Sequence, residues 1–131
     1  MIPAPVNITI RRGDTKNIFF RVRERTWNPA LNGGAGGYEA GPYRDLTGWS
    51  VLSQIRESKD AADPAATFAV TLSNQTTTPG GVTLKLTAAV TKDMVLPPTG
   101  GVWDVQLTDA AGDVHTYIEG SVAFEKDVSR V

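Results

Sequence analysis

The chain has 131 residues, a length that fits a single domain with one hydrophobic core. Hydrophobic residues make up 40% and charged residues 21% of the sequence, which excludes a disordered or fibrous protein. The 13 basic and 14 acidic side chains leave a net charge of -1, so neither nucleic acid nor an anionic membrane is expected as a partner.

Two absences narrow the chemistry further. The sequence contains no cysteine, which removes disulfides, thiolate metal sites and cysteine nucleophiles. The first residues, Met1 to Pro5, do not form a basic segment followed by an apolar run, and no stretch approaches the ~20 apolar residues of a membrane span. We therefore expect a soluble protein without an export signal of its own.

The N-terminal region predicts two strands separated by a turn at Arg12-Gly13-Asp14-Thr15. Residues that alternate with polar neighbours, at the period of a strand, are Val6, Ile8 and Ile10, then Ile18, Phe20 and Val22. Arg21, Arg23 and Arg25 fall on the opposite face of the second strand, where they are expected to be solvated. Phe19 interrupts this polar face and is expected to cover an edge or contact a neighbour.

The alternation stops between residues 26 and 44, a segment rich in glycine. We expect a long loop inserted in the domain, which is unusual because connections in compact domains typically have about 4 to 6 residues. Trp27, Tyr38 and Tyr43 lie in this segment. They either present a contact surface or fold back over an open end of the fold, and the sequence leaves both readings open.

Asp45-Leu46-Thr47-Gly48 predicts a tight turn that begins the next strand, with the Asp45 side chain bonded to the backbone two residues on. In the strand that follows, Trp49 is expected in the interior and Leu52 on the opposite face. Later segments add a short strand through residues 68–72, another strand through residues 82–86, and a helical turn near residues 88–94 that Thr87 would cap.

The C-terminal third predicts a hairpin. Its first strand buries Trp103, and its loop at residues 109–113 contains Gly112. Its second strand carries Val114 and Ile118 on one face and His115 on the other, and it bends at Gly120. The whole pattern predicts an all-β fold, an antiparallel immunoglobulin-like β-sandwich of about 7 to 8 strands.

The residues that could carry catalysis are few. His115 is the only histidine and falls on a polar face, and Asp109 and Asp113 flank a turn, where aspartate commonly serves the local backbone. No glycine-rich segment follows a strand and opens a helix, so a phosphate site is not expected. We therefore expect no catalytic residues, no metal site and no cofactor.

Several short motifs follow one another in an order that resembles a known family. They are Ile10-Arg11-Arg12-Gly13-Asp14-Thr15, Asp45-Leu46-Thr47-Gly48-Trp49, Gln54-Ile55-Arg56, Leu84-Lys85-Leu86-Thr87, Trp103-Asp104-Val105-Gln106-Leu107 and Asp127-Val128-Ser129-Arg130. In order and spacing the chain resembles β-sandwich proteins of tailed-bacteriophage virions, and is similar to the N-terminal domain of upper baseplate proteins and related tail-fibre adaptors.

This resemblance implies a non-enzymatic structural protein of the virion, assembled in the bacterial host cytoplasm. Its implied role is that of an adaptor in the tail, baseplate or fibre-attachment region that docks other virion proteins. It also implies a homo-oligomer or many symmetric copies. A capsid decoration protein is the alternative. A carbohydrate-binding module, with Trp27, Tyr38 and Tyr43 stacking on sugars, is the alternative from another class.

Two groups of residues are candidates for contact with partners. The first combines the aromatic residues of segment 26–44 with their neighbours, and its members are Phe19, Trp27, Tyr38, Tyr43 and Arg44. The second consists of terminal arms that could add to a neighbour's strand edge, and its members are Met1, Ile2, Pro3, Val128, Arg130 and Val131.

Overall fold

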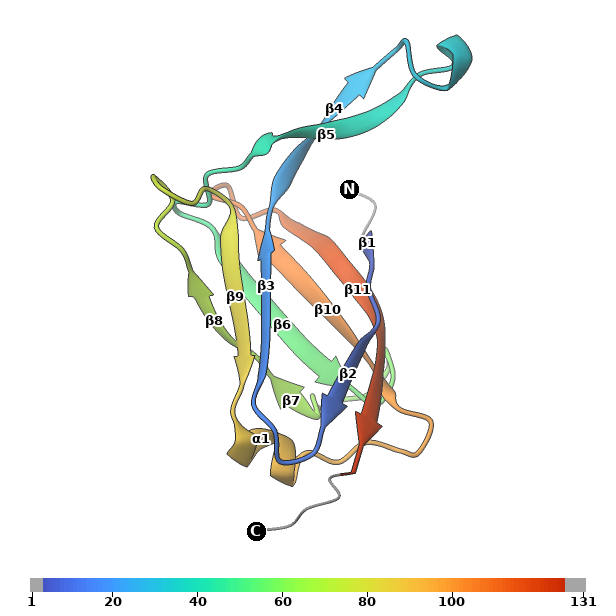
Figure 1. Cartoon of the computed structure of the whole chain (residues 1–131), viewed down its shortest axis with the longest axis vertical. Coiled ribbons are helices and arrows are strands. Elements are labelled where there is room, and N and C mark those ends of the chain that lie inside the picture. Colours follow the sequence, from blue (N-terminus) through green and yellow to red (C-terminus); the bar gives the residue numbers. More distant parts are fainter. Residues whose placement is uncertain (1–3, 127–131) are drawn as a thin grey trace. The chain divides into compact units, whose positions relative to one another are not determined.

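The computed structural model describes residues 4–126, apart from the side chains at positions 25 and 26. These residues form an all-β, sandwich-like fold (Figure 1). The strands are β1 (Ala4–Pro5), β2 (Ile8–Arg11), β3 (Lys16–Arg21), β4 (Arg23–Asn28), β5 (Gly37–Tyr43), β6 (Ser50–Arg56), β7 (Ala66–Thr67), β8 (Ala69–Leu72), β9 (Gly81–Leu86), β10 (Gly101–Thr108) and β11 (Val114–Glu125). The helical turns are η1 (Asn32–Gly34) and α1 (Ala88–Asp93).

The strands form three sheets. The largest has the order β1-β11-β10-β6-β7, and β2 also pairs with β11. A second sheet has the order β3-β9-β8, and β4 pairs with β5 as a separate two-stranded sheet. The chain divides into two compact units: the first comprises residues up to Ile18, residues 48–70 and residues from Leu84 onward, and the second comprises residues 19–47 and 71–83.

The pairing of the N-terminal strands differs from the expected antiparallel arrangement. β10 is antiparallel to both β6 and β11, but β1 and β2 run parallel to β11. The register places Ile10 opposite Phe124, and Ile10 is fully buried. The first strand therefore lies alongside the last one while it keeps its apolar face inward.

The core of the first unit includes many of the inward-facing positions that the alternation predicts. Its buried hydrophobic side chains are Ile10, Ile55, Ala66, Phe68, Leu84, Leu86, Met94, Trp103, Val105, Leu107, Ile118 and Val122. The rings of Phe68 and Trp103 lie 6.0 Å apart between centroids. Trp103 is buried as expected, whereas Trp49 is only half-buried just before β6. Phe68 separates two short strands, β7 and β8, where a single strand was expected.

A β-bulge makes the start of the last strand face the opposite way from the prediction. Val105 pairs with Ile118 but Gln106 pairs with Thr116, so Tyr117 is an extra residue in β11. Because a bulge exchanges the two faces of a strand, the alternation seen after residue 118 does not extend back to the start of β11. Val114 is consequently exposed and His115 is half-buried opposite Leu107, the reverse of the prediction.

Gly120 lets the N-terminal segment approach the sheet. A side chain at this position would meet the backbone oxygen of Val6, since an ideal Cβ would lie 1.8 Å from that atom. The indole Nε1 of Trp103 donates a hydrogen bond of 2.8 Å to the same oxygen, and Asn7 Oδ1 accepts from the backbone of Ser121 at 3.0 Å. The sequence predicted a bend at Gly120, and in the structure this glycine allows two backbone segments to approach each other closely.

The expected helical turn is confirmed as α1. The Thr87 hydroxyl accepts a hydrogen bond from the backbone of Val90, as a helix N-cap does. Thr91 is fully buried, and its hydroxyl accepts from the backbone of Gly13 at 3.1 Å and donates to the carbonyl of Asp14 at 2.8 Å. The turn between β2 and β3 is thus attached to the helix.

Candidate docking surface and sheet-face groove

The glycine-rich segment 26–44 is not the structureless loop that was expected. Most of it belongs to a β-hairpin in which β4 and β5 pair antiparallel, with Trp27 opposite Tyr38 (Figure 1). Only the residues between the two strands form a loop, and it contains η1. Glycine and proline residues interrupt the alternating pattern by which a strand is recognised in the sequence. A two-stranded hairpin nevertheless tolerates both residue types in its strands and in its turn.

A β-bulge places the two tyrosines of β5 on one face of this hairpin. Arg25 pairs with Ala40 and Arg23 pairs with Tyr43, so β5 has one residue more than β4 in this interval. Tyr38 and Tyr43, five positions apart, would lie on opposite faces of a regular strand. The extra residue brings them to the same face as Trp27. We call Trp27, Tyr38 and Tyr43 the aromatic face of the hairpin.

The outer part of the aromatic face is the Trp27–Tyr38 pair. The two rings meet edge to face, with centroids 5.1 Å apart and an interplanar angle of 73°. Trp27 also covers Gly36, where an ideal Cβ would lie 2.3 Å from the indole ring and where φ is +86°. Trp27 is 53% exposed and Tyr38 is 64% exposed, so both rings are ordered by local contacts and still open to a partner.

The inner part of the aromatic face is Tyr43 with two arginines. The guanidinium carbon of Arg21 lies 3.5 Å from the centre of the Tyr43 ring, and that of Arg23 lies 4.8 Å from it. Both arginines are fixed further, since Arg21 Nε donates to the Pro79 carbonyl and Arg23 Nε to the Gly41 carbonyl. Two cations on one ring make this part of the surface basic as well as aromatic.

The opposite side of the hairpin is polar. Asn28 Nδ2 donates to Glu39 Oε2 at 3.3 Å, and Arg44 forms an ion pair of 3.1 Å with Glu24. Arg44, a candidate for partner contact, is thus held by an acidic side chain of its own unit. Phe19, another candidate, lies on β3 and is 58% exposed.

The base of the hairpin is tied down by backbone and amide hydrogen bonds. Val22 donates to the Gly80 carbonyl and accepts from the backbone of Arg44. The side-chain oxygen of Gln75 accepts from the backbone N–H groups of Leu46 and Gly80, each at 2.9 Å. The turn expected at residues 45–48 comes next in the chain. The Asp45 carboxylate accepts hydrogen bonds from the Thr47 hydroxyl and from the Thr47 backbone N–H, and these bonds lower the pKa of Asp45.

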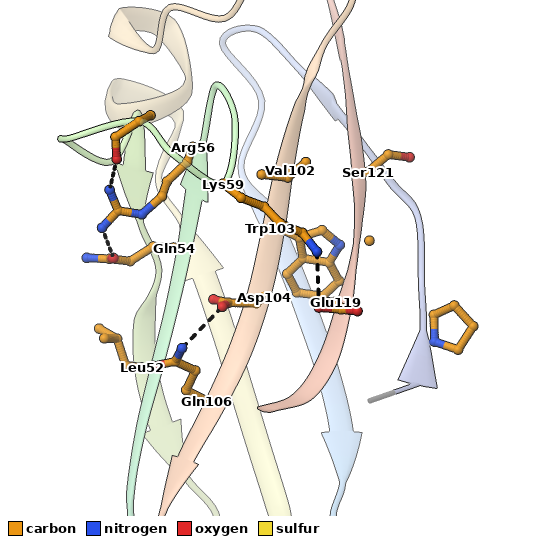
Figure 2. Close-up of a pocket in the computed structure, with 13 residues that line it drawn as sticks. Leu52, Gln54, Arg56, Lys59, Val102, Trp103, Asp104, Gln106, Glu119 and Ser121 are labelled. Atoms are coloured by element: carbon orange, nitrogen blue, oxygen red, sulfur yellow. Dashed lines mark hydrogen bonds and ion pairs between the residues drawn. The ribbon is translucent and has the colours of Figure 1, made fainter. Parts of the chain in front are cut away.

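A second feature lies on the outward face of the large sheet, in the first unit. Side chains of β6, β10 and β11, together with the loop after β6, line a groove of about 750 Å³ (Figure 2). Its central row runs across three strands, because Asp104 pairs with Gln54 on one side and with Glu119 on the other. We call this cavity the sheet-face groove.

The polar side chains of the groove are held in place by their neighbours. Arg56 donates to the Ala61 carbonyl at 2.7 Å and to Gln54 Oε1 at 3.0 Å, and Gln106 donates to Asp104 Oδ2 at 3.3 Å. Desolvation by the groove raises the pKa of Asp104, and the charge of Glu119 raises it further. The Gln106 hydrogen bond and the charges of Arg56 and Lys59 oppose this rise.

Sequence patterns did not predict this groove. The alternation correctly placed Leu52 and the polar residues of the same strands on the outward face, but it treated them as ordinary solvated positions. Only the pairing of the strands reveals the groove, because residues 54, 104 and 119 come together through the register of three strands.

The titratable residues considered for catalysis serve the hairpin loop between β10 and β11. Asp109 Oδ1 accepts from the backbone of Asp113 and Ala111, and its Oδ2 lies 3.3 Å from His115 Nε2. These contacts, the Asp113 backbone first, lower the pKa of Asp109. Within residues 4–126, no three His, Asp or Glu side chains gather as metal ligands would.

The candidate arm residues Met1, Ile2, Pro3, Val128, Arg130 and Val131 lie outside the described residues. None of the helices in the part of the chain that the structure describes is long and apolar enough to span a membrane.

No protein-family model matches the chain, and no curated protein is found to be similar in sequence.

Proposed function

We propose that the protein is a non-enzymatic structural component of a bacteriophage virion, an adaptor in the tail, baseplate or fibre-attachment region. The observation that supports this proposal best is the aromatic face of the β4–β5 hairpin. Aromatic side chains and arginines are the residues that most often dominate protein–protein interfaces, and here Trp27, Tyr38 and Tyr43 are all more than two fifths exposed.

The construction of the hairpin supports docking over a structural role for these rings. An isolated two-stranded hairpin is marginally stable in water, so exposing three large aromatic side chains on one has a cost that a partner would remove. The rings are already ordered, Trp27 by Gly36 and Tyr43 by two arginines, so a partner would pay little entropy to bind them.

A non-enzymatic role is supported by what the polar groups already do. Asp109 accepts a hydrogen bond that closes a hairpin loop, and His115, the one histidine of the sequence, lies beside Asp109. This pair serves the loop, and no adjacent nucleophile is part of it. The same proposal places the protein in the particle as multiple symmetric copies. The capsid surface is the alternative location.

The experiment uses purified virions of the phage that encodes the chain. Mass spectrometry should detect the protein in the particles, and cryo-electron microscopy should locate repeated copies whose hairpin contacts a neighbouring virion protein. The same images distinguish tail from capsid. Absence of the protein from purified particles would overturn the proposal.

A variant tests the role of the aromatic face within the particle. Particles assembled with Trp27→Ala should incorporate at least about tenfold less of the protein, the loss expected when one central interface residue is removed. Val114→Ala, which removes another exposed apolar side chain on a different strand, should be incorporated normally. Equal incorporation of both variants would contradict docking through the hairpin.

A further inference from the structure

We propose that the sheet-face groove is a binding site for a neutral saccharide. This inference is independent of the hairpin and of the virion role, because every residue that carries it belongs to the first unit. The groove's volume of about 750 Å³ lies within the range of pockets that hold small ligands, which is roughly 300–1,000 Å³.

The charges of the groove select against ionic ligands. Arg56 and Lys59 contribute two positive groups, and Asp104 and Glu119 contribute two negative groups, which balance. An anion such as a phosphate would meet both carboxylates, whereas a cation would meet the guanidinium and the ammonium group. A neutral ligand that both donates and accepts hydrogen bonds avoids both penalties.

The hydrogen-bonding groups match hydroxyl pairs. Carboxylates accept, a guanidinium donates, and amides do both, so Asp104, Arg56, Gln54 and Gln106 together offer each kind of partner to a sugar hydroxyl. Gln54 is fixed on both ends, because its Oε1 accepts from Arg56 and its Nε2 donates to Thr67 at 3.2 Å. Preorganised groups on rigid strands reduce the entropy that binding costs.

The position of these groups distinguishes a saccharide from a peptide. Extended peptides usually bind by adding to the edge of a sheet through their main chain. The groove lies on the face of β6, β10 and β11, and its polar row consists of side chains (Figure 2). Leu52 and Val102 add apolar surface against which the carbon–hydrogen face of a sugar ring can pack.

Lys59 is an exposed residue of the groove lining. Its ammonium group lies 3.9 Å from Glu119, so the side chain reaches from the loop after β6 across β10 to β11 (Figure 2). The Lys59 side chain is 78% exposed, and such surface ion pairs contribute little. A ligand that displaces Lys59 from Glu119 therefore costs the protein little stability.

The test begins with a glycan array that contains neutral oligosaccharides, among them maltotriose, cellotriose and chitotriose, and anionic glycans with sialic or uronic acids. The whole protein should bind at least one neutral glycan, and calorimetry on that glycan should give a dissociation constant between micromolar and millimolar. Binding to anionic glycans alone, or to none, would overturn the proposal.

Matched variants assign the binding to the groove. Asp104→Ala and Gln106→Ala should each weaken the neutral glycan at least about tenfold, since each removes hydrogen bonds from the ligand. Asp113→Ala, an aspartate in the exposed loop between β10 and β11, should bind like the unchanged protein, and circular dichroism confirms that all variants fold. If Trp27→Ala abolishes binding while Asp104→Ala and Gln106→Ala retain it, the sugar binds the hairpin and the groove proposal is wrong.

Discussion

At the scale of single residues, Asp104 lies opposite another carboxylate in the middle of a sheet. It is flanked by Glu119 on β11 and by Gln54 on β6, and like charges that face each other across strands destabilise a sheet. Partial burial adds to this effect, since it raises the pKa of Asp104. Such a residue weakens the folded state, which is common where a side chain is retained for binding.

The raised pKa of Asp104 gives a pH-dependent prediction. Because the folded state holds this proton more tightly than the unfolded chain, the ionised carboxylate costs stability at pH values above its folded pKa. That cost disappears as the pH falls through the folded pKa. Asp104→Asn should therefore raise the melting temperature at pH 7 by up to a few degrees, and by less near pH 4.

Calorimetric melting curves at several pH values check this expectation. The groups that act on Asp104 are Gln106, Arg56, Glu119 and Lys59, and all of them stay in the variant. Asp113→Asn is the control for removing one negative charge from an exposed position. A variant less stable than the unchanged protein at pH 7 would show that the Asp104 carboxylate contributes to stability.

At the scale of the elements, sequence patterns predicted features that residues close to one another in the chain determine. The hairpin of β10 and β11, the Thr87 cap and the turn at Asp45 all depend on local chemistry, and all were predicted. The bulge at Tyr117 was missed because a bulge leaves no change in composition. It exchanges the two faces of β11, and this explains why Val114 and His115 were assigned to the wrong sides.

The hairpin β4–β5 and the sheet-face groove were missed for different physical reasons. In the hairpin, glycine and Pro42 replaced the alternating residues by which a strand is recognised. The sequence singled out Trp27, Tyr38 and Tyr43 but left open whether they are exposed or fold back over the domain, and in the structure all three are exposed. The groove depends on the register of three strands, and register is a property of pairing that a single strand's sequence does not contain.

The base of the hairpin depends on one amide side chain, which gives a prediction for this element. Gln75→Ala leaves the N–H groups of Leu46 and Gly80 without their acceptor, and Leu46 is fully buried. The substitution should lower the free energy of unfolding by about 1–3 kcal/mol, the usual cost of leaving a buried donor unpaired.

Denaturant titration measures that free energy, and amide hydrogen exchange locates the effect, which should be largest at Leu46 and Gly80. Thr76→Ala is the matched control, since the exposed Thr76 contributes only its backbone N–H to the turn. Unchanged exchange at both amides in Gln75→Ala would mean that another group replaces the glutamine oxygen.

At the scale of the whole molecule, the two units differ in the size of the core that each buries. The fully buried large hydrophobic side chains of the first unit are Ile10, Ile55, Leu84, Leu86, Val105, Leu107 and Val122, whereas those of the second are Val22, Leu46 and Val82. Local stability follows buried apolar surface, so the second unit, which contains the hairpin, should open more readily than the first.

This difference predicts two modes of hydrogen exchange in the isolated protein. Amides bonded between β4 and β5 should exchange at least about tenfold faster than those between β6 and β10, because opening the hairpin exposes little apolar surface. At low denaturant concentrations, exchange in β10 should accelerate with the slope of global unfolding, while exchange in the hairpin should hardly change.

In the assembled particle the hairpin amides should slow selectively, because a partner on the aromatic face stabilises only the closed hairpin. Equal rates and equal denaturant slopes in the two regions of the isolated protein would mean that it unfolds as one cooperative body, and a hairpin whose exchange is unaltered by assembly would leave its aromatic face without a partner.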